Sequence, residues 1–231
     1  MEPTSALGGP IAREPTLGDQ AHDRLCALLM AGQVAPGDRL SLRDLAARLG
    51  ISVMPVREAV ARLAASGALD VSAKRAASVP LMGLARFRDI TKVRIEVEGF
   101  AAAEAARNRS TDDLQRIGAA EAAFRALRDD RSGDMARAVQ INQEFHFAVY
   151  AAAGSPTLTE LITPLWLRVG PVLNLDLRAS PERLQKGQAV ACHAAALAAI
   201  RAGDAEGARA AIARDIASAA EFIIARGCLA P

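Results

Sequence analysis

Apolar side chains recur at helical spacing through the first third of this chain. In the segment SLRDLAARLG they follow an i, i+3, i+4, i+7 pattern, at Leu42, Leu45, Ala46 and Leu49. Similar stripes run through 19–30 and 53–66. Residue types that begin and end helices flank two of these segments: Ser41 and Gly50 flank 42–49, and Ser52 and Gly67 flank 53–66. We therefore expect three short amphipathic helices.

From 68 to 80 the spacing changes. The alternating segments ALDV and ASVP stand on either side of the basic stretch SAKRA, which is typical of a small β-hairpin. After Pro80 helical spacing returns, and it predicts six helices at roughly 84–107, 111–131, 134–153, 157–169, 181–201 and 204–226. Four prolines are expected to break up the middle of this region, Pro156, Pro164, Pro171 and Pro181.

Composition agrees with a mainly α-helical fold. The 231 residues are 51% hydrophobic but only 3% aromatic, and alanine, the strongest helix former, is abundant. The three cysteines are widely spaced without a CxxC pair, so neither a disulfide framework nor a cysteine zinc site is indicated. Residues 1–18 lack the apolar core of a signal peptide, and no apolar run approaches the ~18 residues of a membrane span. We expect a cytoplasmic protein that does not bind a membrane.

The order helix, turn, helix, hairpin is typical of a winged helix-turn-helix, whose second helix enters the major groove of DNA. That helix would present Ser52, Val53, Met54 and Arg57. The fork of Arg57 suits O6 and N7 of guanine, and Arg43 could reach a phosphate or a base edge. Lys74 and Arg75 at the hairpin tip would contact phosphates or the minor groove. The alternative is a small helical subdomain with solvated arginines.

Charge favours the DNA-binding interpretation. The net charge of the whole chain is only +2, but the segment 41–75 holds six basic residues against three acidic ones. A local surplus of this kind fits a surface that faces phosphates.

The stretch APGDRLSLRDLAARLGISVMPVREAVARLAASGAL resembles the DNA-binding domain of GntR-type transcription regulators. That pattern reads P-G-x-x-L, then L-A-x-x-L-G-[VI]-S, then P-V-R-E-A, then L-x-x-x-G. Two departures stand out. Val53 and Met54 replace the frequent Arg-Thr before the proline, so an apolar contact such as one to a thymine methyl group would replace one base-reading arginine. Ala76 stands where the wing usually has glycine.

The helical remainder resembles the FCD ligand-binding domain of the FadR-like branch of that family. The matching segments are VRIEVEGFAAAEAA, NQEFHFAVYAAAGSPTL, LWLRVGP and CHAAALAAIRAGDAEGARAAIARDI. We expect a disordered arm at 1–18, the winged helix-turn-helix at 19–80, a linker at 81–86 and an all-helical effector-binding and dimerisation domain at 87–227.

Many FCD domains hold a divalent metal on one aspartate and three histidines, together with a small carboxylate effector. The resemblance places these ligands at Asn142, His146, His193 and Asp215, so one acid and two histidines remain while the acid has changed place. Two imidazoles and a carboxylate suit zinc, nickel, cobalt, iron or manganese. Asn142 would be a weak ligand or a hydrogen-bond partner. The alternative is a polar pocket without metal.

Spacing supports this set independently. The last two predicted helices meet near Gly203, ten residues after His193 and twelve before Asp215. At ~1.5 Å per residue both side chains lie about 15–18 Å from the turn, hence at similar heights in an antiparallel pair.

Two arginines are candidates for binding the effector. Arg94 matches a family arginine that faces the cavity and can clamp a carboxylate with two hydrogen bonds. Its alternative role is an i, i+4 pair with Glu98 on a solvated helix face. Arg168, in LWLRVGP, is a second candidate.

These observations predict a homodimeric repressor that binds a two-fold symmetric operator and responds to a small carboxylate. Effector binding would shift operator affinity by ~1–3 kcal/mol. A metal sensor, a metal-free effector binder and a metal-dependent hydrolytic enzyme are the alternatives. The enzyme would leave the DNA-binding half unexplained, and Glu144 points to another helix face than the candidate ligands.

Overall fold

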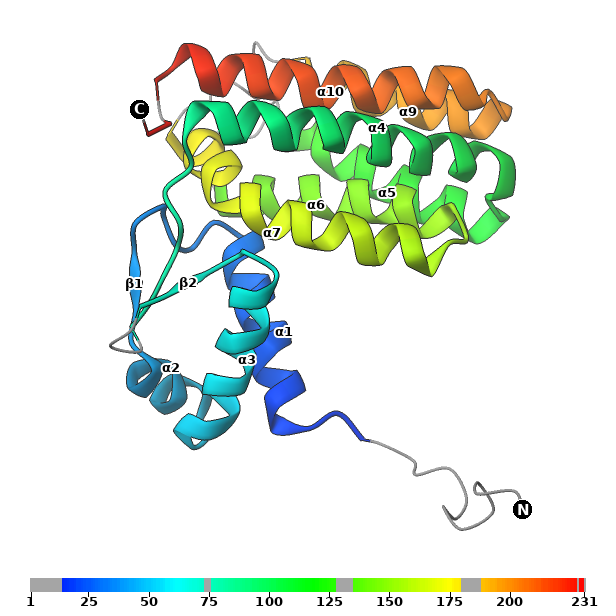
Figure 1. The fold of residues 1–231 in the computed structure, drawn as a ribbon. Coiled ribbons are helices and arrows are strands. Elements are labelled where there is room, and N and C mark those ends of the chain that lie inside the picture. Colours follow the sequence, from blue (N-terminus) through cyan, green and yellow to red (C-terminus); the bar gives the residue numbers. More distant parts are fainter. Residues whose placement is uncertain (1–13, 73–75, 128–134, 180–187, 228, 231) are drawn as a thin grey trace, which may run out of the picture.

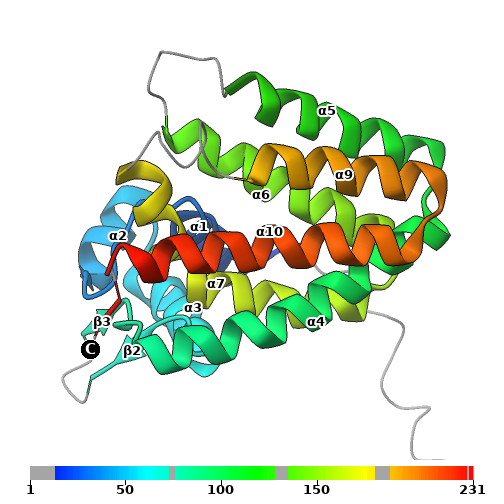
Figure 2. The same ribbon diagram turned by 90° about the horizontal axis from the view of Figure 1, so that it is seen from above.

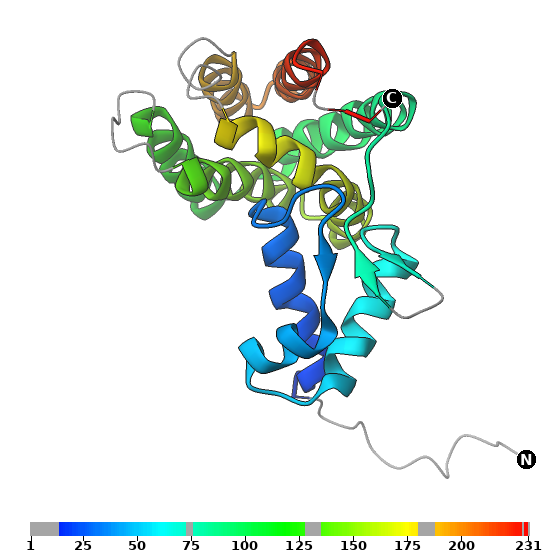
Figure 3. The same cartoon turned by 90° about the vertical axis from the view of Figure 1, so that its left-hand side faces the viewer.

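A small N-terminal unit lies beneath a larger bundle of long helices in the computed structural model (Figure 1, Figure 3). The model describes residues 14–72, 76–127, 135–179, 188–227 and 229–230. The described part confirms a mainly helical protein with an N-terminal winged helix-turn-helix and a C-terminal helical domain.

The N-terminal unit contains three helices and a three-stranded sheet. Its elements are α1 (Leu17–Met30), β1 (Arg39–Leu40), α2 (Leu42–Leu49), α3 (Val53–Ala65), β2 (Asp70–Val71) and β3 (Ala77–Ser78). Strands β2 and β3 form the predicted hairpin, and β1 pairs antiparallel with the other side of β3. Strand β1 was not predicted, because two residues are too few to give an alternating pattern.

Helix ends in this unit follow local chemistry. Ser41 caps α2 by accepting a hydrogen bond from the Asp44 amide, and Gly50 ends the helix in the left-handed region at φ 66°. Ser52 stands at the start of α3 as expected, but its side chain makes no capping hydrogen bond. Helix α1 begins two residues earlier than predicted, because Thr16 and Asp19 cap each other's backbone amides.

The helical bundle follows from Leu84 onward. Its helices are α4 (Leu84–Asn108), α5 (Thr111–Leu127), α6 (Met135–Ala152), α7 (Pro156–Ala179), α9 (Ala189–Ala202) and α10 (Ala205–Ala225). Helix α10 lies along both α4 and α9, while α5 packs on α6 and α9 (Figure 2). The predicted end of one helix at 131 and the predicted starts of two others at 134 and 181 fall outside the described residues.

The expectation that prolines break up the middle of the bundle was wrong for α7. Pro164 and Pro171 lie inside this helix, which runs ten residues past its predicted end at 169. A helix can continue through proline when tertiary packing compensates for the lost hydrogen bond. Ile162, Trp166 and Val169 of α7 are all buried.

The core is continuous between the two units. Leu29 and Leu63 of the N-terminal unit belong to the same cluster of buried side chains as Ile162 and Trp166 of α7. Helix α7 also approaches α1 closely, since a Cβ at Gly170 would lie 3.1 Å from the Leu29 carbonyl oxygen. Among the described residues, no helix is both long and apolar enough to cross a membrane.

Candidate functional site

The first turn of α3 presents the side chains expected to read DNA. Ser52, Met54 and Arg57 are exposed and Val53 is half-buried, while the opposite face of the helix is fully packed, at Val56, Ala59, Val60 and Leu63. Met54 is 65% exposed, so its side chain is accessible for an apolar contact with a partner. Arg43 is exposed on α2. Lys74 and Arg75 lie outside the described residues.

A second group of polar residues lies inside the helical bundle. Among the described residues, six side chains there with a carboxylate, guanidinium or imidazole group are at most 6% exposed, namely Arg94, Glu98, Glu121, His146, His193 and Asp215. Burying such groups costs free energy unless they pair with one another or with a ligand. Their concentration in one domain therefore marks a candidate site.

His146, His193 and Asp215 converge from three helices. Nε2 of His146 lies 3.1 Å from Oδ2 of Asp215, and Nε2 of His193 lies 3.8 Å from the same oxygen. One potential ligand atom from each residue lies within 4.8 Å of the other two. The similar heights predicted for His193 on α9 and Asp215 on α10 are thus met. Asn142 is half-buried on α6, one turn before His146.

Electrostatics favour an ionised carboxylate beside neutral His193. Burial would raise the pKa of Asp215, but the neighbouring His193 and the hydrogen bond from His146 outweigh it and hold that pKa well below its usual range. Burial lowers the pKa of His193 against the opposing effect of Asp215. An anionic oxygen beside a neutral imidazole is the protonation state that a metal requires of its ligands.

The residues fit a divalent ion. Two ligand atoms bound tetrahedrally to one zinc-like ion at ~2.0–2.1 Å are about 3.3–3.4 Å apart, a value that lies between the 3.1 Å from His146 to Asp215 and the 3.8 Å from His193 to Asp215. Both ring nitrogens of His193 are buried and lack a hydrogen-bond partner in the described part of the chain, since 3.8 Å is too long for a hydrogen bond. Phe145 stacks on the face of the His193 ring with centroids 4.0 Å apart, which leaves the in-plane nitrogens free to face a ligand.

Arg94 and Glu98 form a buried ion pair beside this group. Nε of Arg94 donates to Oε1 of Glu98 at 2.6 Å, and Nη2 donates to Oε2 at 3.2 Å. The i, i+4 pair considered as an alternative from sequence therefore exists. It does not lie on a solvated helix face, because the two side chains are 5% and 0% exposed. An effector carboxylate could use Arg94 only in competition with Glu98.

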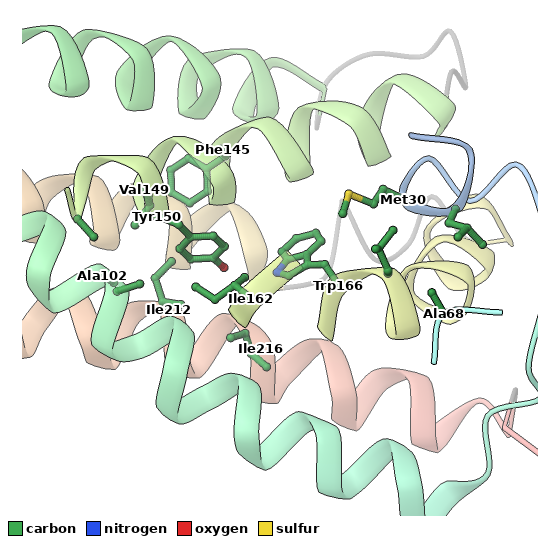
Figure 4. Packing of buried hydrophobic residues seen from close by; sticks show 14 of the residues in the cluster. Met30, Ala68, Ala102, Phe145, Val149, Tyr150, Ile162, Trp166, Ile212 and Ile216 are labelled. Carbon is green, nitrogen blue, oxygen red and sulfur yellow. The ribbon is translucent and has the colours of Figure 1, made fainter. Parts of the chain in front are cut away.

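Glu98 has two further donors. The Trp166 indole N–H donates to Oε2 at 3.1 Å, and the Tyr150 hydroxyl donates to the same oxygen. Figure 4 shows Tyr150 and Trp166 facing each other in the core. Tyr150 also contacts Nδ1 of His146 at 3.0 Å, so the Arg94–Glu98 pair is joined to the His–Asp group.

Arg168 lies elsewhere. Its Nε donates at 2.7 Å to the carbonyl oxygen of Ser66, which caps the C-terminal end of α3. The guanidinium also packs against Gly67, where an added Cβ would lie 3.3 Å from Nε. This arginine thus joins α7 to the end of the candidate reading helix.

Sequence reasoning missed Glu98, Tyr150, Trp166 and Glu121 as members of the buried polar group. Sequence spacing could have revealed two of them, because Glu98 follows Arg94 by four residues and Tyr150 follows His146 by four. Glu121 on α5 has no comparable signal. Its Oε1 is buried without a hydrogen-bond partner in the described part, and its Oε2 lies 3.6 Å from Nη2 of Arg125.

Comparison with known proteins matches both halves of the chain. The model of bacterial regulatory proteins of the gntR family matches residues 17–79, and the FCD domain model matches 89–218. The HTH-type transcriptional regulator McbR of Escherichia coli (strain K12) is 35% identical over 191 residues, which cover 82% of this chain and 85% of that protein.

A solved structure and a second relative extend this comparison. The solved structure of E. coli McbR/YncC has a TM-score of 0.84 at 31% identity and covers 92% of this chain and 99% of that one. The uncharacterized HTH-type transcriptional regulator BphR of Paraburkholderia xenovorans (strain LB400) is 28% identical over 164 residues, covering 69% of this chain and 67% of that protein.

Proposed function

Because this chain belongs to the GntR family of transcription regulators and carries an FCD domain, we propose that it is an operator-binding repressor controlled by a small carboxylate. The family assignment makes the chain a regulator rather than an enzyme. We further propose that it acts in the cytoplasm as a homodimer, with 19–80 binding DNA and 87–227 binding the effector.

The exposed first turn of α3 is the observation that carries the DNA-binding role. Its Ser52, Met54 and Arg57 face outward from a helix whose other face is packed, so a partner can reach them without unfolding the domain. Helix-turn-helix domains place this part of the helix against base edges in the major groove. Arg57 would bind a guanine with both arms of its guanidinium.

Operator binding can be tested by selection from random DNA. Full-length protein would select duplexes from a random pool, and the enriched sequences should contain a two-fold symmetric site occupied by two chains. Arg57→Ala should weaken binding to that site by ~1–3 kcal/mol, because one two-armed base contact is lost. Arg107→Ala, an exposed change in α4, is the control. Unchanged affinity of Arg57→Ala would exclude α3 as the reading helix.

An exposed apolar ridge on α4 supports the homodimer. Val93 and Phe100 are two helical turns apart and each is 43% exposed. Exposed apolar side chains on one helix face are typical of a surface that another subunit covers. Two chains related by a two-fold axis would then present two α3 helices to two half-sites.

The His146, His193 and Asp215 group supports a metal-assisted effector site. A divalent ion held there would offer open coordination positions to an effector carboxylate. Asn142 would assist from one turn away on α6. The ion is the better partner for the carboxylate, since Nε and Nη2 of Arg94 are already bonded to Glu98. A metal-responsive regulator, in which the ion is itself the signal, would use the same residues.

Helix α7 offers a route from the effector site to the DNA-binding unit. Trp166 donates to Glu98 inside the bundle, and two residues later Arg168 donates to the last turn of α3. An effector that prefers one arrangement of these contacts would shift operator affinity by that difference in binding energy. We therefore assign Arg168 to coupling in preference to effector binding.

A further inference from the structure

The hydrogen bonds around Tyr150 determine where protons must lie. A phenol has one proton to donate. Glu98, the ion-pair partner of Arg94, accepts hydrogen bonds from Arg94 and Trp166 and is also the acceptor for the Tyr150 hydroxyl. The Tyr150 hydroxyl therefore has in Glu98 an acceptor for its only proton.

His146 must then supply the proton for its own contact with Tyr150. Nδ1 of His146 lies 3.0 Å from the phenol oxygen. If the phenol proton points to Glu98, two lone pairs would face each other unless Nδ1 carries a hydrogen. The opposite arrangement, with Tyr150 donating to Nδ1, would instead leave the phenol lone pairs facing the Glu98 carboxylate. With a metal ion on Nε2, which otherwise faces the Asp215 carboxylate at 3.1 Å, only the first arrangement gives every atom in this chain a complementary partner.

We propose that Tyr150 is a positioning residue that, held by Glu98, keeps the hydrogen of His146 on Nδ1 and leaves Nε2 as the nitrogen that binds the divalent metal. Nε2 is the atom that faces Asp215, at 3.1 Å. The path from Arg94 through Glu98 and Tyr150 to His146 therefore performs the role that a carboxylate commonly has behind a metal-bound histidine, with a phenol inserted between the two. Its metal-binding part rests on the metal site of the proposed function.

The proposal can be tested first with Tyr150 in place. The chain has only three histidines and one tyrosine, so the imidazole signals of protein labelled with ¹⁵N can be assigned with His22→Gln and His193→Gln. We expect Nδ1 of His146 to be protonated in zinc-treated protein, in which Nε2 binds the ion. Zinc should change the signal of Nε2. An unprotonated or zinc-bound Nδ1 would overturn the proposal.

Tyr150→Phe then separates positioning from packing. This change keeps the ring in the core and removes the hydroxyl, so we expect His146 to lose its fixed Nδ1–H form and the zinc dissociation constant to rise by about 10–100-fold. Thr91→Val removes a hydroxyl elsewhere on α4, where Oγ1 of Thr91 donates to the Phe87 carbonyl oxygen, and it should leave the His146 tautomer unchanged and zinc affinity within about threefold.

The possible outcomes distinguish this inference from the metal site itself. Equal zinc affinity in Tyr150→Phe and the unmodified protein, or an equal loss in Thr91→Val, would contradict a positioning role for the phenol and would leave the metal site standing. If the unmodified protein takes up no zinc, nickel or manganese, the proposed metal site itself fails.

Discussion

The two units of this protein treat charge in opposite ways. In the N-terminal unit the arginines proposed to contact DNA, Arg43 and Arg57, are exposed to solvent, and no described charged side chain of that unit is buried. In the described part of the helical bundle, six side chains with a carboxylate, guanidinium or imidazole group are buried. An exposed charge costs little before its partner arrives, whereas a buried charge must be compensated within the fold at all times.

This difference explains why the two candidate sites look unlike each other. The DNA-binding surface is a set of separate side chains on a rigid helix. The bundle site is a connected network, in which removing one member leaves others unpaired. Substitutions in the two units should therefore differ most in how strongly they change the free energy of unfolding.

The largest effect is expected from Glu98→Ala. It would leave the Arg94 guanidinium buried at 4% exposure without its counter-ion, together with two other unpaired donors. Breaking a buried pair in this way costs ~3–5 kcal/mol. Urea unfolding followed by circular dichroism would measure it.

A matched control lies on the same helix. Arg107 and Glu104 form an i, i+3 pair whose side chains are 50% and 27% exposed. Glu104→Ala should cost less than ~1 kcal/mol, because solvent screens such pairs. Similar costs for the two substitutions would show that burial does not set the energetics of α4, and the contrast between the two units would lose its basis.

An intermediate effect is expected at the His–Asp group. Zinc at about 100 times its dissociation constant should raise the free energy of unfolding by ~2.7 kcal/mol, because the ion binds only the folded protein. Asp215→Ala and His193→Ala should each abolish this stabilisation and the bound metal. Elemental analysis after chelation and reloading would measure metal content, with His22→Ala as a control from outside the bundle.

Full zinc occupancy in either variant would exclude these residues as ligands. Loss of occupancy in Asn142→Ala as well would make that amide a ligand, whereas unchanged occupancy would limit it to a neighbouring role.

The sequence predicted the DNA-binding unit more completely than the bundle. Short helices with strong apolar stripes and local caps, such as α2 between Ser41 and Gly50, depend on neighbours in the sequence and can be read from it. The convergence of His193 and Asp215 was also predictable, because a turn near Gly203 fixes their relative heights. Strand β1 and the length of α7 depend on tertiary contacts instead, with β3 for the strand and with the buried core for the helix.

The buried network was the part that sequence could not supply. An arginine and a glutamate four residues apart look the same on a solvated face as in a core, and alanine-rich helices such as α4 give little contrast between faces. Burial of Arg94 and Glu98 is decided by α6 and α7, which bring Tyr150 and Trp166 to the same carboxylate. Such convergence of distant helices leaves no periodic trace in one sequence.

The smallest effect is expected where the two units meet. Arg168→Ala removes one hydrogen bond to the Ser66 carbonyl, so the free energy of unfolding should fall by only ~0.5–1.5 kcal/mol. Local consequences should be clearer than global ones. We expect faster amide hydrogen exchange in 63–69, at the end of α3, because this segment loses its contact with α7, while exchange in α9 stays unchanged.

Zinc provides the test of coupling between the units. If α7 transmits the state of the bundle, zinc should change amide exchange in 63–69 of the unmodified protein and should not do so in Arg168→Ala, although both bind the ion equally. Arg209→Ala, a partly exposed change on α10, is the control and should keep the zinc response. A response that survives Arg168→Ala would mean that the apolar contact of α7 with α1, where Gly170 meets Leu29, carries the signal without the hydrogen bond. The junction between the exposed DNA-binding site and the buried bundle site would then act through apolar packing alone.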